Sequence, residues 1–92
     1  MRDVWREIQW TEESEAHIAR HSVAPGEVEQ LVNTRPRYVV DGRESTTLIY
    51  GTTDDGRHLL VVTAASEDGR HYVVTARDMD DAERRAFVRK AR

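Results

Sequence analysis

Histidines and arginines are the side chains of this sequence with the greatest capacity for chemistry. His17 and His21 stand four residues apart, so they would share one face of a helix and could hold a transition metal if a third ligand joined them. The nearby glutamates all precede His17, which leaves no HExxH arrangement, and the chain has no cysteine. The pair is interpreted as surface histidines, or as acid-base groups or contacts to RNA. We expect neither a metal nor a cofactor.

Arginines gather where the last apolar run of the sequence ends. Arg77 stands at the end of that run, and Arg84 and Arg85 follow in a segment with helical periodicity. Guanidinium groups at the junction of a strand and a helix can clamp a phosphate through paired hydrogen bonds. Alternatively, the helix arginines belong to an ordinary solvated face and pair with nearby carboxylates. The alternative for Arg77 is that it is a charged residue that simply ends the strand.

A third set of candidates lies in the β-rich middle of the chain. Arg57 and His58 are adjacent, so a regular strand turns them to opposite faces and at most one of them belongs to a given cleft. Tyr50 could stack on a nucleobase or pack against a neighbouring strand. The sequence contains no glycine-rich phosphate loop, GxSxG elbow or zinc-ribbon spacing, which removes the support for most enzyme classes.

Charge is distributed unevenly along the sequence. The net charge is -3, which argues against a general nucleic-acid coat protein. Residues 11–33 carry five glutamates and one arginine, a balance of -4, whereas residues 83–92 carry five cations and one glutamate, a balance of +4. An anionic partner would therefore be attracted to the C-terminal end by the local field.

The 92 residues suit one domain that spans 1–92, with 38% apolar and 34% charged residues. No stretch approaches the roughly 20 apolar residues of a membrane helix, and residues 1–10 are too charged for a signal peptide. We expect a folded, cytoplasmic protein that does not contact membranes.

Three Asp-Gly pairs separate the β-rich runs and predict tight hairpins, because glycine tolerates a positive φ. A strand is expected first, and Pro25 divides the helical segment that follows it into two. The expected fold class is α+β, with an N-terminal strand and helical pair, a four-stranded antiparallel meander and a C-terminal basic helix. The expected ranges are strand Val4 to Trp10, helices Thr11 to His21 and Pro25 to Val32, strands Tyr38 to Val40, Thr46 to Thr53, Arg57 to Ala65 and His71 to Arg77, and a last helix with an apolar stripe of Ala82, Ala86, Phe87 and Ala91.

Four segments together resemble the BrnT family, and they cover the chain from Ile8 to about Phe87. The segments are Ile8 to Thr11, His17 to Val23, Gly51 to Arg57, and Val74 to Met79 with Glu83 to Arg85. Members of that family are small bacterial type II toxins, RelE-like ribonucleases that a BrnA antitoxin neutralises. The resemblance implies a RelE/BrnT-like fold, a growth-inhibiting RNA-binding protein and a BrnA-like antitoxin partner. Operator DNA would be bound only through the antitoxin, and a homodimer is possible.

The resemblance also implies metal-independent cleavage, in which a 2'-hydroxyl attacks the adjacent phosphate while arginines stabilise the charge on its oxygens. Arg77 and Arg85 would bind phosphate, and His21 would transfer protons. Substrate contacts are expected from His17, Arg57, Arg84 and Tyr50.

The sequence departs from the family pattern at several positions. Ser22 stands where the family usually has glycine, Thr52 stands where it often has arginine, and Glu12, Glu13 and Ser14 occupy a region that often contains a lysine. Two cationic positions are therefore missing. The alternative function is a catalytically weakened or inactive toxin-fold protein that acts as a protein-binding module.

Overall fold

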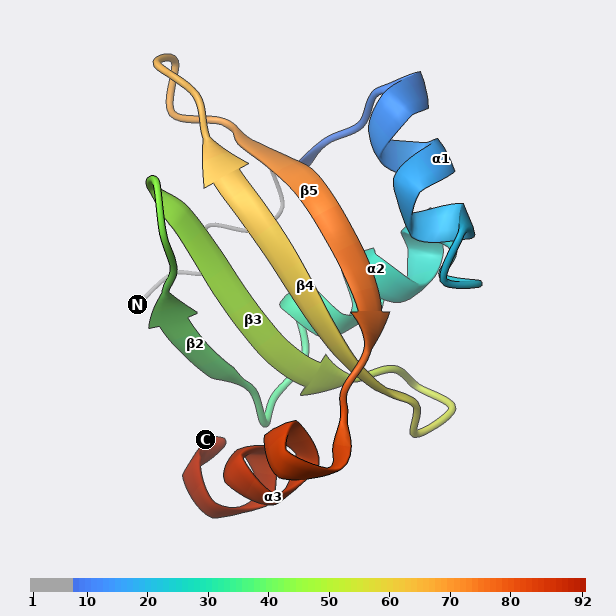
Figure 1. Ribbon diagram of the computed structural model, residues 1–92, viewed down its shortest axis with the longest axis vertical. Helices are drawn as coiled ribbons and strands as arrows, with labels where there is room; N and C mark the ends of the chain where they lie inside the picture. The colour runs from blue at the N-terminus through green and yellow to red at the C-terminus, as the bar shows by residue number, and fades with distance from the viewer. Residues whose placement is uncertain (1–7) are drawn as a thin grey trace.

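A mixed sheet of five strands carries two helices on one face and a third helix at one end (Figure 1). The computed structural model describes residues 8–92, so the Val4 to Glu7 part of the first predicted strand lies outside the described residues. The elements are β1 (Ile8–Gln9), α1 (Glu12–Ala19), α2 (Pro25–Val32), β2 (Tyr38–Asp41), β3 (Thr46–Thr52), β4 (His58–Ala65), β5 (His71–Asp78) and α3 (Asp81–Lys90). The α+β class and the order of the elements are confirmed, with strand ends that differ from the prediction by one residue.

The strands lie in the order β1-β5-β4-β3-β2. The strands β2 to β5 form the predicted antiparallel meander, whereas β1 pairs in parallel with β5 and makes the sheet mixed. A parallel neighbour requires a crossover, which the chain supplies through α1, α2 and the meander. A strand from the N-terminal part of the sequence, β1, thus forms the edge of the sheet beside β5.

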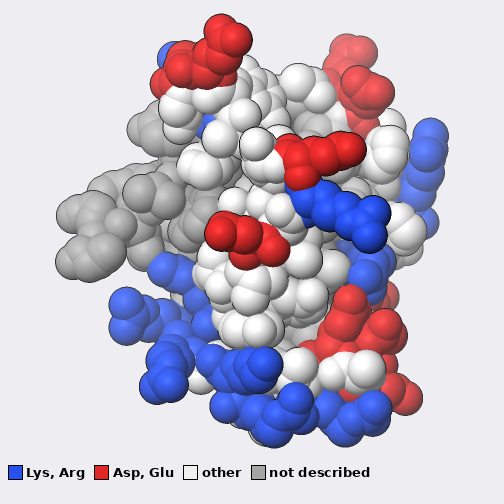
Figure 2. Space-filling view, turned by 60° about the vertical axis from the view of Figure 1, so that its left-hand side comes forward, with Lys and Arg blue, Asp and Glu red and all other residues white. Residues whose placement is uncertain are grey.

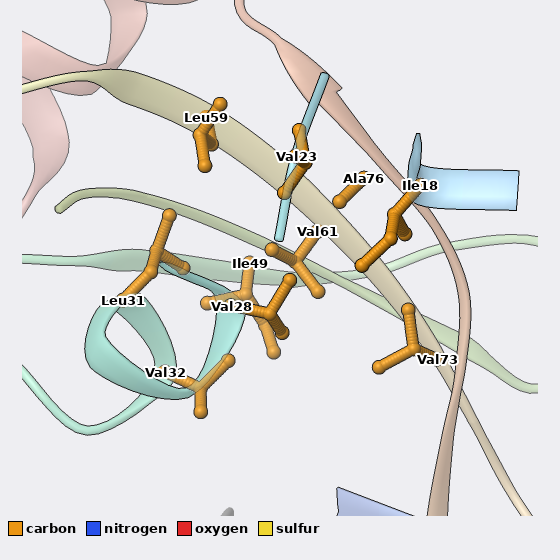
Figure 3. Packing of buried hydrophobic residues seen from close by; sticks show 10 residues of the cluster. All are labelled: Ile18, Val23, Val28, Leu31, Val32, Ile49, Leu59, Val61, Val73 and Ala76. Carbon is orange, nitrogen blue, oxygen red and sulfur yellow. The ribbon is translucent and has the colours of Figure 1, made fainter. Parts of the chain in front are cut away.

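The hydrophobic core lies between the sheet and the pair α1 and α2. The helices contribute Ile18, Val28, Leu31 and Val32, which are fully buried, and alternate residues of the strands pack against them (Figure 3). The buried residues of α2 are Val28, Leu31 and Val32. The strand side of the core consists of Ile49, Leu59, Val61, Val73 and Ala76.

Two of the three Asp-Gly pairs form the predicted turns. Gly56 and Gly69 both have φ of 85°, and each is preceded by a hydrogen-bonded turn that begins at Thr53 or Ser66. This is the three-residue hairpin in which a left-handed residue closes a type I turn.

The Asp41-Gly42 pair does not form the centre of its hairpin, and this part of the prediction is wrong. Glu44 and Ser45 occupy the turn instead, with φ of 55° and 65°. Gly42 is required for another reason, because a Cβ at this position would collide with the Thr46 hydroxyl and approach Leu48 to 3.3 Å. The absence of a Cβ at Gly42 thus leaves room for the side chains of Thr46 and Leu48.

Hydrogen bonds at both ends of α1 explain its length. Thr11 caps the first turn, and the Ser14 hydroxyl completes a capping box by accepting a hydrogen bond from the Thr11 backbone. At the other end the N–H groups of Ser22 and Val23 donate to the carbonyls of Ala19 and Ile18, with Ser22 at φ of 60°. These bonds define a Schellman motif, so helical hydrogen bonding ends close to His21 as predicted.

The helix α3 lies across one end of the sheet, near the start of β2 (Figure 1). Its predicted apolar stripe is narrower than expected, because Phe87 is buried while Ala86 and Ala91 are half-buried and Ala82 is exposed. Phe87 contacts His58 edge to face, with ring centroids 5.7 Å apart. Among residues 8–92, none of the helices has the length and apolar character needed to cross a membrane.

Candidate nucleic-acid interface

A row of side chains crosses the sheet on the face opposite α1 and α2. Tyr38 pairs with Tyr50, Tyr50 with Leu60, and Leu60 with Arg77, so one residue from each strand of the meander occupies the row. Directly paired residues project to the same face, while their neighbours Ile49, Val61 and Ala76 face the helices. The register therefore places Tyr50 and Arg77, both predicted site residues, on one surface.

The tyrosines of this row stack on each other. Their ring centroids are 5.5 Å apart with an angle of 28° between the planes, and the Lys90 Nζ atom lies 5.6 Å from the centroid of Tyr38. Burial, followed by the nearby Glu83 carboxylate, raises the pKa of Tyr50, so the phenol is neutral and can donate a hydrogen bond at physiological pH.

Arg77 is held by the first turn of α3. Its two terminal nitrogens donate to the two oxygens of Glu83 at 2.8 and 2.9 Å, and one of them also donates to the Asp78 carbonyl at 3.0 Å. Glu83 also accepts the backbone N–H of Asp80 as part of the capping box. The hydrogen bond from Arg77 is the main reason that the pKa of Glu83 is lowered. The Arg77 side chain is 39% exposed, and its guanidinium is oriented by a carboxylate at the edge of the row.

Arg57 has a different environment on the other face of the sheet. Its five N–H groups donate to Glu27, Asp78 and the backbone carbonyls of His21 and Ser22, at 2.7 to 3.4 Å. Asp78 raises the pKa of Arg57, and the hydrogen bond from Arg57 lowers that of Asp78. A phosphate that bound Arg57 would have to displace one of these acceptors. His58, the next residue, packs against α3, so the two diverge as the alternation rule predicted.

His17 and His21, the two histidines predicted as site residues, lie on the side of the molecule that carries α1 and α2. His21 is exposed in the α1 to α2 junction, where its side chain helps to lower the pKa of Asp78. His17 is half-buried and lines a pocket of about 260 Å³ between α1 and β5, with Thr11, Glu13, Ser14, Val73 and Val74. The predicted site residues therefore form two groups, with His17, His21 and Arg57 on the side of α1 and α2, and Tyr50 and Arg77 on the opposite face.

Arg84 and Arg85 are exposed on α3. With Val88 and Arg89 they line a shallow groove of about 340 Å³ on the outer side of this helix. Val88 is 75% exposed. Within residues 8–92 neither arginine forms an ion pair that would hold it in the Arg77 and Tyr50 row. Any contact of Arg84 or Arg85 with the same ligand would therefore come from the border of that surface.

A further group of basic side chains was not identified from the sequence as a site. Arg35, Arg37, Lys90 and Arg92 surround a pocket of about 490 Å³ together with Tyr38 and Val39. Figure 2 shows basic side chains along the lower edge of the view, with acidic side chains at the lower right and in the middle of the otherwise mostly uncharged surface. The signal in the sequence was the pair of basic clusters at 35–37 and 84–92, but their proximity depends on tertiary structure.

Among residues 8–92, no three histidine, aspartate or glutamate side chains are grouped closely enough to hold a metal ion. Comparisons of the chain with protein-family models, with curated proteins and with solved structures find no match.

Proposed function

We propose that this protein binds single-stranded RNA across the Tyr38, Tyr50 and Arg77 row and cleaves it as a RelE-like ribonuclease toxin. The observation that carries the proposal is the row itself, in which stacked aromatic rings lie next to a guanidinium and are bordered by basic side chains. Aromatic rings bind bases with little dependence on sequence, and arginines bind phosphates. An α+β order that ends in a basic helix agrees with the RelE/BrnT-like topology that we propose.

In this proposal Arg77 binds the phosphate on which the 2'-hydroxyl acts. Its partner Glu83 lies beside Arg77, so this carboxylate would accept the proton of the hydroxyl as Arg77 turns to the phosphate. The P–O5' bond breaks as the 2',3'-cyclic phosphate forms, and the neutral Tyr50 phenol would give its proton to the leaving 5'-oxygen. Arg84 and Arg85 would hold the outgoing strand, and His21, His17 and Arg57 would act only on RNA that continues around the end of the sheet.

A BrnA-like antitoxin is the proposed natural inhibitor. An acidic segment of such a partner would cover the same surface, because the border residues that attract RNA also attract carboxylates. Operator DNA would then be contacted through the antitoxin.

The test is expression of the wild-type chain in a bacterial host beside Arg77→Ala, with Arg70→Ala as the matched control. Arg70 is an exposed arginine at the β4 to β5 turn, whose ion pair joins it to Asp68 at 3.6 Å. We expect growth arrest and fragmented RNA with the wild-type chain and with Arg70→Ala. Cells that contain an equal amount of soluble Arg77→Ala protein should grow normally and keep intact RNA. Normal growth and intact RNA with the soluble wild-type chain would contradict ribonuclease activity.

The second candidate function is that of a catalytically weakened or inactive toxin-fold protein that acts as a protein-binding module. One observation favours it, because Arg57 and Arg77 are both engaged by carboxylates of the chain itself. Co-purification with a small acidic partner, in a host whose RNA remains intact, would support this function over cleavage.

A further inference from the structure

The outer face of α3 presents an exposed apolar side chain among cationic ones. Val88 is 75% exposed, and it lines the shallow groove of about 340 Å³ with Arg84, Arg85 and Arg89. The spacing of these four residues places them on one face of the helix, while Phe87 is buried on another. Burial of an exposed valine against an apolar surface is favourable. An occupant of this face should therefore combine an apolar contact with negative charge.

A surface with the complementary features lies between α1 and β5. Its pocket of about 260 Å³ contains Glu13 and Val74, which is 44% exposed. The register between β4 and β5 shifts at this point, so Val74 is the extra residue of a β-bulge. Glu12 and Glu15 are also exposed in the first turn of α1. The pocket thus offers an apolar side chain next to carboxylates.

The two surfaces belong to one chain but lie too far apart to meet within one molecule. Figure 1 shows α1 beside the upper part of β5, and α3 beyond the lower end of the sheet. The sequence has the same division of charge, with a balance of -4 in residues 11–33 and of +4 in residues 83–92. A second copy of the chain would supply each surface with its complement, because opposite charges bring the two together.

We propose that the outer face of α3 binds the α1 and β5 pocket of a second copy of this chain, with Val88 against Val74 and the arginines of α3 beside Glu13. The contact can close reciprocally between two copies or continue from copy to copy. An interface built on so few residues is small, so the association is weak and depends on salt.

This inference concerns the protein alone and does not depend on the proposed cleavage. Arg84 and Arg85 also belong to the border of the proposed RNA surface. RNA and a second copy of the chain would therefore compete for α3.

The test is sedimentation equilibrium of the whole chain up to millimolar concentration, in low and in high salt. Val88→Asp changes the α3 face and Glu13→Arg changes the pocket, and both residues are exposed, so each variant should fold, which circular dichroism checks. The matched control is Glu67→Arg, which makes the same change of charge at an exposed position of the β4 to β5 turn. The decisive sample is an equimolar mixture of Val88→Asp and Glu13→Arg, in which one protein supplies an intact pocket and the other an intact α3 face.

We expect the wild-type chain and Glu67→Arg to associate, and high salt to weaken their association because exposed charges are screened. Val88→Asp should lower the association constant about tenfold or more, the factor that corresponds to burial of a valine side chain. Glu13→Arg should lower it as well, and the mixture should associate more strongly than either variant alone. A mixture that associates as weakly as its components, or a Val88→Asp protein that associates like wild type, would overturn the proposal. A wild-type chain that stays monomeric in low salt would also overturn it, and would leave the α3 face to a different acidic partner.

Discussion

Thr63 is a fully buried residue of β4 whose hydroxyl has no hydrogen-bond partner among the described residues. A buried polar group without a partner costs about 1 to 3 kcal/mol, because it loses its hydrogen bonds to water on folding. Thr53 provides the contrast within the same chain. It is also buried, but its hydroxyl accepts the backbone N–H of Arg57 at 3.1 Å.

We predict that Thr63→Val raises the free energy of unfolding by about 1 kcal/mol. Valine has nearly the shape of threonine, so the core keeps its packing and loses only the unsatisfied hydroxyl. Thr53→Val serves as the control and should lower the free energy of unfolding by a similar amount, since it removes a hydrogen bond that is made. Urea unfolding of the three proteins measures both changes, and a destabilised Thr63→Val protein would contradict the prediction.

Ser22 has a φ of 60°, a left-handed backbone conformation that favours glycine. A residue with a Cβ pays about 1 to 2 kcal/mol in the left-handed region, whereas glycine does not. We predict that Ser22→Gly stabilises the protein by up to about 1 kcal/mol. Ser22→Ala keeps the Cβ and should bring no gain. Thermal unfolding followed by circular dichroism distinguishes the two, and equal melting temperatures would show that the backbone is not strained here.

At the scale of elements, the hairpin of β2 and β3 concentrates strain in its turn. Glu44 and Ser45 both adopt a positive φ, the pattern of a type I' turn, which favours Asn-Gly at these positions. The turn lies at the end of the sheet away from α3, and it holds the edge strand that carries Tyr38. A more stable turn would therefore stabilise β2, the edge strand of the proposed RNA surface, without a substitution in that surface.

We predict that the double substitution Glu44→Asn with Ser45→Gly raises the free energy of unfolding by about 1 kcal/mol, because it relieves backbone strain at two positions with a positive φ. The control is Glu67→Gly, a substitution in the β4 to β5 turn, where the left-handed position already holds Gly69. That control should bring no gain. An unchanged urea midpoint for the double variant would indicate that the turn adopts another geometry.

For the whole molecule, Arg57 joins three regions that are distant in the sequence. It connects the β3 to β4 turn with the α1 to α2 junction, with α2 through Glu27, and with the end of β5 through Asp78. Arg77 and Glu83 make a second connection from β5 to α3. In the folded state these contacts lower the pKa values of Asp78 and Glu83, so both carboxylates bind protons less readily than in the unfolded chain.

The sign of the resulting pH dependence follows from these lowered pKa values. Both carboxylates stabilise the fold fully above their unfolded pKa values of about 3.9 and 4.3, and this contribution disappears as the pH falls through the lower folded values. We predict that the free energy of unfolding decreases as the pH falls from about 5 to 3. Asp78→Asn should be less stable at neutral pH and should show a weaker acid dependence. Glu67→Gln, an exposed control, should retain the wild-type dependence, and parallel curves for Asp78→Asn would contradict the role of the ion pair.

Local signals in the sequence accounted for most of the fold. Pro25 begins α2 as expected, Gly56 and Gly69 close the turns in which their Asp-Gly pairs were expected, and the β-branched runs form strands. These outcomes depend on the backbone preferences of a few adjacent residues. The prediction of a turn centred on Asp41-Gly42 was wrong. Gly42 instead leaves room for the Thr46 side chain, and local backbone preferences do not reveal this contact.

The candidate site depended on contacts between residues that are far apart in the sequence. The sequence by itself determined which chemical groups are present, including the arginines of the last helix and Tyr50, and it determined the order of the strands that carry them. Strand register and helix docking decided the rest. Pairing placed Tyr38, Tyr50 and Arg77 on one surface, and the backbone bonds between Arg37 and Arg92 assembled the basic pocket. The physical reason is that a side chain's neighbours across a sheet are set by pairing between distant segments, whereas its face and its turn are set by the residues next to it.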